Sequence, residues 1–390
     1  RPFSSELFNT PTGIATTHFR SIGKSLVRLR GSANASLRLD LLQECCHHLY
    51  LAGSADDLIT FAEHGVELAK RAGRESDVRR FYAVLGIAYA DIGDRGKGVE
   101  FTSRALAIAA KLSDCFGQYV AWSNLSVVLV DSGLYSEGIA CASRALELID
   151  IQDPNARDYR ARVLTNTSIA KFHLGDYEEA ERFAYEAVSL SEEPTSLRST
   201  IMRLIRELNL VLALVANERY AEARKHARYM EQISSSFPSP RAEGIANLCD
   251  GFTEFYVGDT VRAVKKVEDV VDRSRGGLFP IYVDALSVLS RLYADLNRPT
   301  DALRVLDELH HQLTSVKSES VVSQLRAIGG HGESIERALK RNQREHKRMH
   351  AELRAKVMEL EVSRSRQEML ERMAVAADIR EDISGEHGYR

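Results

Sequence analysis

Proline and aromatic residues are scarce in this sequence, which has 8 prolines in 390 residues and 7% aromatic residues. Long helices exclude proline and strands favour aromatic side chains, so this balance favours an all-α fold over a sheet. A strong charge of one sign is also missing, because 52 basic and 55 acidic residues give a net charge of −3. Without a basic excess, the composition does not indicate a nucleic-acid partner.

Long apolar runs are absent as well. The longest run, from Leu208 to Ala216, is interrupted by Asn209 and is too short to cross a bilayer. We find no signal peptide, so we expect a cytoplasmic protein that has no membrane partner. The five cysteines form no CxxC pair and mostly fall within apolar helical patterns. They are therefore expected to be small buried hydrophobic residues in a reducing compartment.

The sequence contains no nucleophile elbow, no phosphate-binding loop and no HExxH phrase. We therefore expect no complete active site and no bound cofactor in this chain. Its function must be sought in the pattern that is present.

That pattern is an internal repeat. An apolar helical stretch is followed by a turn residue and then by a second, alanine-rich stretch. The turn residues, which follow one another at intervals of 39 to 43 positions, are Gly53, Gly93, Gly133, Gly175, Glu218, Gly258 and Asn297. Glycine, and next to it asparagine, readily adopts the left-handed conformation that ends a helix. The repeat therefore predicts about seven helix pairs.

A small residue recurs five positions after most of these turns. Small side chains there allow two antiparallel helices to lie close together, and alanines such as Ala142 and Ala145 lie on one face of the second helix. A single pair cannot bury its apolar face alone, so neighbouring pairs are expected to stack. The recurring small residues are Gly98, Gly138, Ala180, Ala223, Ala263 and Ala302.

These features resemble the tetratricopeptide repeat (TPR) family over residues 38–313. The family's signature places are occupied by Trp122, Leu125, Gly133, Ala142 and Ala145. The family period is near 34 residues, whereas this chain repeats about every 40, which implies longer helices or loops. The resemblance implies a TPR-like α-solenoid, a right-handed superhelix whose first helices line a concave groove. Such grooves bind extended peptides or partner helices.

Several side chains are candidates for this peptide-binding groove. Asparagine recurs at one first-helix position as Asn124, Asn166 and Asn209, and in some family members such an asparagine holds a peptide backbone or carboxylate. The remaining candidates are Arg80 and Arg162, which could supply charge, and Phe172, which could supply apolar contact. The alternative is that these asparagines and aromatic residues serve packing between helices.

Beyond the repeats we predict a hinge over residues 314–333 and a coiled-coil helix over 334–379. This helix has neither glycine nor proline, and a heptad register extends from Leu339 to Ala377. This heptad register predicts a parallel homodimer. Polar seam residues such as Lys356 weaken such a dimer, although polar seam residues can also fix its register. The alternative is one long helix that folds back on the solenoid. The basic stretch Lys340–Arg348 is interpreted as a solvated helix face.

The final residues, Ala374 to Arg390, resemble the opening of an HD-GYP-type phosphohydrolase domain, so residues 380–390 are interpreted as its stub. The matching residues are Arg380, Glu381, Asp382, Ser384, Gly385 and His387. The resemblance makes His387 the first ligand of a divalent metal. Ile383 stands where the family often has an acidic residue that bridges metals. The resemblance therefore does not imply that cyclic-di-GMP is the substrate. No HD dipeptide occurs in the chain.

Three functions are compatible with this order of segments. The first is a bacterial signalling protein whose TPR sensor acts through the coiled coil on an HD-type phosphohydrolase. The second is a non-enzymatic scaffold that dimerises through the coil, and the third is a sensor for a diguanylate cyclase. We expect both ends of the chain to be cut, with residues 1–37 forming an N-terminal extension.

Overall fold

The computed structural model describes residues 34–275 and 279–314, together with the single positions 351, 355 and 358. Over residues 34–275 and 279–314 the chain is all-α and forms fourteen helices and no strand, so the predicted fold class and the seven helix pairs are confirmed. The helices are α2 (Ala35–Ala52), α3 (Ala55–Arg71), α4 (Glu75–Asp91), α5 (Arg95–Lys111), α6 (Cys115–Asp131), α7 (Tyr135–Glu147), α8 (Ala156–His173), α9 (Tyr177–Ser189), α10 (Leu197–Ala216), α11 (Tyr220–Ser236), α12 (Pro240–Val257), α13 (Thr260–Ser274), α14 (Phe279–Asp295) and α15 (Pro299–Thr314).

Polar side chains define where many of these helices begin. The side chain of Asp114 accepts a hydrogen bond of 2.7 Å from the Gly117 amide at the start of α6. Ser239 caps α12 in the same way, and Pro240 occupies the first turn. The first backbone amides of a helix have no acceptor within the helix. These caps therefore supply hydrogen-bond acceptors for them.

The turns between paired helices follow the predicted geometry at six of the seven positions. Gly53, Gly93, Gly133 and Gly175 have φ values between 75° and 83°. The two non-glycine turns are also left-handed, with φ of 61° at Glu218 and 55° at Asn297. Gly258 is the exception, because its φ is −149° and α12 ends there without a left-handed residue. The prediction of a left-handed turn was wrong at this position.

The small residues after these turns lie where paired helices cross. A methyl group on Gly138 would come within 2.6 Å of a Val130 methyl and 3.2 Å of the Ser126 carbonyl oxygen. The Ser126 hydroxyl donates a hydrogen bond of 2.8 Å to the Gly138 carbonyl, and Ser168 makes the same 2.8 Å bond to Ala180 in the next pair. The predicted close approach is confirmed, and a repeated hydroxyl bond accompanies it.

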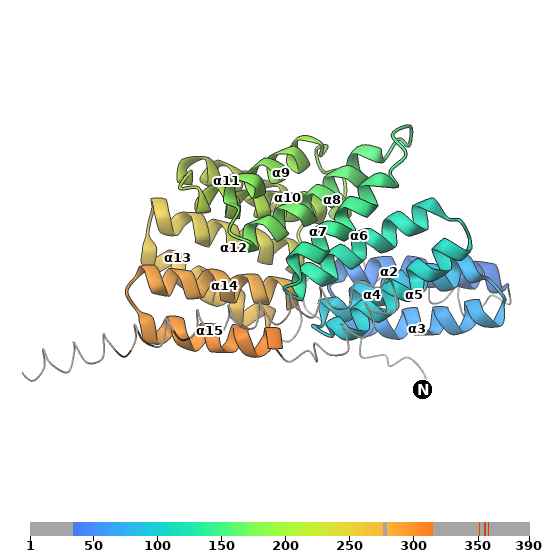
Figure 1. Ribbon diagram of the computed structural model, residues 1–390. Helices are drawn as coiled ribbons and strands as arrows, with labels where there is room; N and C mark the ends of the chain where they lie inside the picture. The colour runs from blue at the N-terminus through green and yellow to red at the C-terminus, as the bar shows by residue number, and fades with distance from the viewer. Residues whose placement is uncertain (1–33, 276–278, 315–350, 352–354, 356–357, 359–390) are drawn as a thin grey trace, which may run out of the picture.

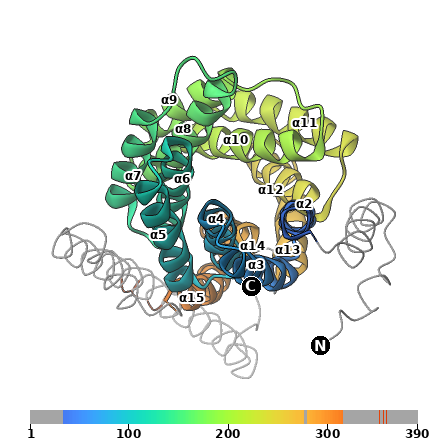
Figure 2. The same cartoon turned by 90° about the vertical axis from the view of Figure 1, so that its right-hand side faces the viewer.

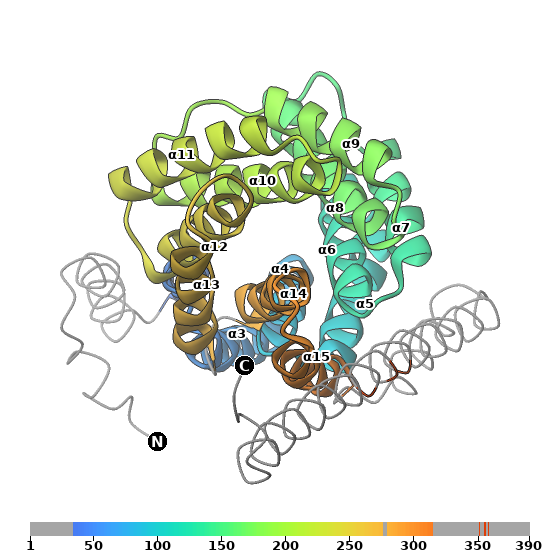
Figure 3. The ribbon, with the colours of Figure 1, turned by 90° about the vertical axis from the view of Figure 1, so that its left-hand side faces the viewer.

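The pairs follow one another around a central axis, as Figure 1 shows from the side. Viewed along the axis, α6, α8, α10 and α12 lie inside, and α7, α9 and α11 form an outer layer (Figures 2 and 3). Each even-numbered helix from α2 to α12 contacts the next even-numbered helix as well as its sequence neighbours. The even-numbered helices therefore make a continuous inner wall.

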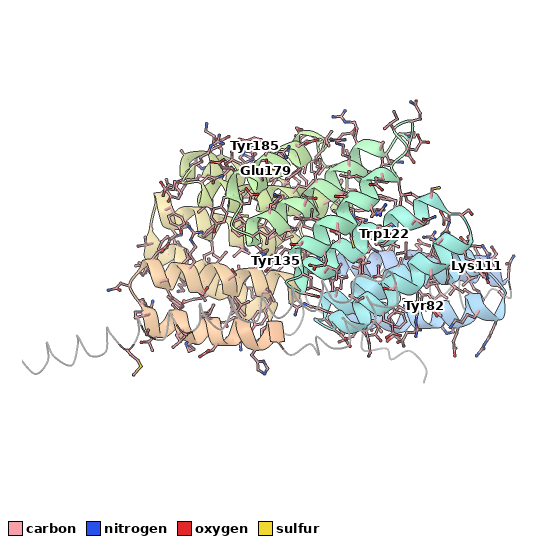
Figure 4. The ribbon with its side chains drawn as sticks, in the orientation of Figure 1. Tyr82, Lys111, Trp122, Tyr135, Glu179 and Tyr185 are labelled. Atoms are coloured by element: carbon pink, nitrogen blue, oxygen red, sulfur yellow. The ribbon has the colours of Figure 1, made fainter. Side chains whose placement is uncertain are left out.

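Apolar clusters hold successive pairs together. The largest cluster extends from Ala184 to Leu309 and another from Leu39 to Ala105. Two small clusters lie between them, and Trp122 of α6, labelled in Figure 4, packs against both. Each repeat thus shares its core with its neighbours, which is how a solenoid gains stability.

Most of the predicted hinge, the coiled coil and residues 380–390 lie outside the described residues. The exceptions are position 314, which ends α15, and positions 351, 355 and 358. The predicted N-terminal extension also lies outside them, except for residues 34–37. No helix among the described residues is long and apolar enough to cross a membrane.

Candidate peptide-binding surface

The inner wall presents Asn124 of α6 and Arg162 of α8 to one another. A guanidinium Nη2 of Arg162 donates to Oδ1 of Asn124 over 2.5 Å. The Asn124 amide in turn donates to the Ala83 carbonyl of α4 over 3.5 Å. The Arg162 side chain is half-buried, while Asn124 is buried. A cation and an amide from the inner helices of consecutive repeats are therefore held against one another.

The other two asparagines differ from each other. Asn166 repeats the Asn124 arrangement, because its amide donates to the Ser123 carbonyl of α6 over 3.2 Å. Asn209 instead donates to Ile205 of its own helix over 2.7 Å. Two asparagines thus link consecutive inner helices, as the packing interpretation predicts, and the third does not.

Arg80 belongs to α4 and lies apart from Asn166 and Asn209. Its guanidinium is 3.7 Å from Asp77 and donates to the Gln43 side chain of α2 over 3.4 Å. Its side chain is 51% exposed, which leaves it accessible to a ligand. A surface hollow of about 430 Å³ at the start of α4 is lined by Gly73, Arg74, Glu75, Ser76, Asp77, Arg80 and Leu112.

Phe172 lies near the end of α8, next to the turn that leads into α9. Its ring centroid is 5.4 Å from that of Tyr177 in α9 and 5.6 Å from that of His173. The ring therefore takes part in the contact between the two helices of its own pair. The structure does not bring it together with Arg162 and Asn124.

An aromatic cluster close to Arg162 was not predicted from the sequence. The rings of Phe116, Tyr119 and Tyr159 have centroids 5.0 to 5.9 Å apart, and Phe116 is 48% exposed. Burial raises the pKa of Tyr119 to about 12, so its hydroxyl remains a donor, bonded to the Tyr159 carbonyl. Tyr119 and Tyr159 are 40 positions apart, and this spacing at the repeat period was a signal for the cluster.

The cysteines offer little reactivity. Cys45, Cys46, Cys141 and Cys249 are buried as predicted, whereas Cys115 is exposed. Burial raises the pKa of Cys45 and Cys141 to about 12, so both remain protonated thiols near neutral pH. Among the described residues no group of three His, Cys, Asp or Glu side chains could hold a metal ion. The predicted metal ligand His387 lies outside them.

Comparison with known proteins agrees with this architecture. Residues 118–193 match the tetratricopeptide repeat family model. No curated protein sequence matches the chain.

Two solved structures share the fold at low sequence identity. One is a Rap protein complexed with competence and sporulation factor (14% identity, 82% of this chain and 90% of that chain covered, TM-score 0.62). The other is the apo form of the quorum sensor NprR from B. thuringiensis (13% identity, 79% and 90% covered, TM-score 0.52). At such identities the likeness concerns the fold, and the described part of this chain is an α-solenoid like that of tetratricopeptide-repeat proteins.

Proposed function

We propose that this protein binds a peptide or an extended segment of another protein along the inner wall of the superhelix. The Arg162–Asn124 pair is the observation that carries the proposal. In this pair a half-buried cation of one inner helix is held by an amide of the inner helix of the neighbouring repeat. Such a fixed cation suits a peptide carboxylate, whether at its end or on a side chain. The Rap protein of the related structure is complexed with competence and sporulation factor, which accords with this use of the fold.

Within this proposal the predicted residues have different roles. Arg162 and Arg80 are the charged contacts, because both guanidinium groups are accessible. Asn124 and Asn166 each use one amide hydrogen to link consecutive inner helices. The second hydrogen of each side-chain amide is the proposed contact to the ligand. Phe172 and Asn209 complete the proposed surface as secondary contacts.

The proposal can be tested with a library of short synthetic peptides that have free carboxyl ends. The tightest binder is then titrated against the wild type and Arg162→Met by calorimetry. We expect the substitution to weaken binding about tenfold, since a charge-assisted contact is lost.

Arg160→Met provides a matched control on the same helix, because Arg160 is exposed and pairs with Glu186 of the outer helix α9. It should leave the affinity unchanged. Equal affinities of the wild type and Arg162→Met, or the absence of any binder in the library, would contradict the proposal.

The finer proposal is that ligand binding is transmitted through a coiled coil over residues 334–379 to an HD-type phosphohydrolase that begins near His387. It is supported by the heptad register and by the phrase between Ala374 and Arg390. A light-scattering mass of the chain with and without residues 334–390 tests the coil. Equal oligomeric states would reject a dimer formed by this segment.

A further inference from the structure

One turn of the superhelix brings its first helix pair into contact with its sixth. Helix α2 contacts α12, although the two are far apart in sequence, and Figure 2 shows them side by side. The other extensive contacts between helices of the described chain join neighbouring repeats. This junction is therefore the place where the ring of helices closes.

A buried ion pair lies at the junction. An Nη2 of Arg241, in the first turn of α12, donates to Oδ2 of Asp91 at the end of α4 over 2.9 Å. The Arg241 and Asp91 side chains are 8% and 12% exposed. The Arg241 guanidinium also lies 4.9 Å from the centroid of the Tyr50 ring in α2. One arginine of a late repeat thus contacts two early helices.

The junction lacks the apolar packing that joins neighbouring repeats. Among the described residues, none of the four apolar clusters combines side chains of α2 to α5 with side chains of α12 to α15. Separating the two sides would expose charged groups but little core. A buried ion pair contributes little net stability, because the cost of removing both charges from water offsets their attraction.

Further carboxylates near the junction oppose its closure. Asp131 of α6 and Asp284 of α14 lie close enough for the charge of Asp131 to raise the pKa of Asp284, on top of the effect of burial. Burial also raises the pKa of Asp131, Arg95 lowers it, and the charge of Asp91 raises it by a smaller amount. The attraction between Arg241 and Asp91 and the repulsion between carboxylates therefore act at the same place.

We propose that Asp91, Arg241 and Tyr50 form a reversible clasp that holds the superhelix closed, and that releasing it opens the interior. Small changes in the rotation between neighbouring repeats add up along a solenoid. The superhelix can therefore open without rearrangement within a repeat. The clasp is independent of the proposed ligand, since it concerns the shape of the protein alone.

The test measures the distance between the two sides by pulsed electron paramagnetic resonance. Spin labels are attached to Thr60→Cys in α3 and Lys265→Cys in α13, both exposed positions. The background carries Cys115→Ser, because Cys115 is the exposed cysteine of the described chain and the others are buried. We expect one narrow distance distribution for this protein. With Arg241→Met added, the distribution should broaden and shift to longer distances.

Arg79→Met is the matched control, because Arg79 is as buried as Arg241 and pairs with Asp114, 3.0 Å away, between neighbouring repeats. It should lower stability without changing the distance distribution. Asp91→Asn keeps the size of the side chain and provides a second test if Arg241→Met does not fold. Unchanged distributions in folded Arg241→Met or Asp91→Asn protein would overturn the clasp.

Discussion

At the scale of single residues, small side chains determine how closely the two helices of a pair can lie. Gly138 faces Val130 and Ser126 across the α6–α7 crossing with no room for a methyl group. Gly244 of α12 has more room, because a methyl group there would lie 3.4 to 3.5 Å from Ile281. The two glycines thus allow the cost of overpacking to be separated from helix propensity.

We expect Gly138→Ala to lower the free energy of unfolding by about 1–3 kcal/mol, since the helices must move apart. Gly244→Ala should be neutral or raise it by about 1 kcal/mol or less, because alanine favours the helix. Urea unfolding followed by circular dichroism measures both values. A stabilising effect of Gly138→Ala would show that the crossing can relax at no cost.

The hydroxyl of Ser126 adds a polar contact to the same crossing through its bond to the Gly138 carbonyl. Ser126 is buried, so Ser126→Ala should cost about 1 kcal/mol. Ser143→Ala is the control, because the Ser143 hydroxyl bonds to Ile139 of its own helix at an exposed position. Its effect on the free energy of unfolding, measured with urea, should stay within about 0.5 kcal/mol. Equal losses for the two variants would mean that the bond between the helices contributes nothing particular.

At the scale of helices and turns, the left-handed residue between two helices is the critical position. Glu218 adopts φ of 61° at the α10–α11 turn and is exposed. Gly175 adopts φ of 80° at the equivalent α8–α9 turn, where nothing lies within 4 Å of an added methyl group. The strain of a side chain at each turn is therefore a backbone effect.

We expect Glu218→Gly to raise the free energy of unfolding by about 1 kcal/mol and Gly175→Ala to lower it by about 1–2 kcal/mol. Thermal unfolding of the two variants and the wild type measures the difference. Shifts of the melting temperature in the same direction for both variants would show that contacts, and not backbone conformation, dominate at these turns.

At the scale of the whole molecule, the carboxylates at the junction make stability depend on pH. Burial raises the pKa of Asp131 to about 6 and that of Asp284 to about 7, from 3.8. The folded state therefore binds more protons than the unfolded state between about pH 4 and pH 7. The stability penalty of these groups is complete above their folded pKa values and diminishes as the pH falls toward 4.

The double variant Asp131→Asn/Asp284→Asn should consequently be more stable than the wild type at about pH 8, and the difference should shrink at about pH 5. Urea unfolding at the two pH values measures this change. Arg95 and Asp91 are the charged neighbours of Asp131, and Asp131 is the charged neighbour of Asp284. The double variant therefore keeps Arg95 and Asp91 unchanged. A pH-independent difference would show that the carboxylates do not titrate in this range.

Much of the fold followed from the sequence because its determinants are local and repeated. A left-handed turn residue, a small residue five positions later and an apolar face act within one helix pair, so the period near 40 revealed seven pairs. Gly258 shows the limit, since a glycine permits the left-handed conformation without imposing it. The predicted roles of Arg80, Asn124, Arg162, Asn166, Phe172 and Asn209 in binding remain predictions.

The sequence by itself determined the helices, their pairing and their stacking order, because these depend on residues within about one repeat of each other. Only the tertiary structure decided which side chains meet where the ring closes. Asp91 and Arg241 are 150 positions apart and occupy unequal places in their repeats. Their contact depends on the rotation accumulated over several repeats, a small angle per repeat that no local pattern encodes.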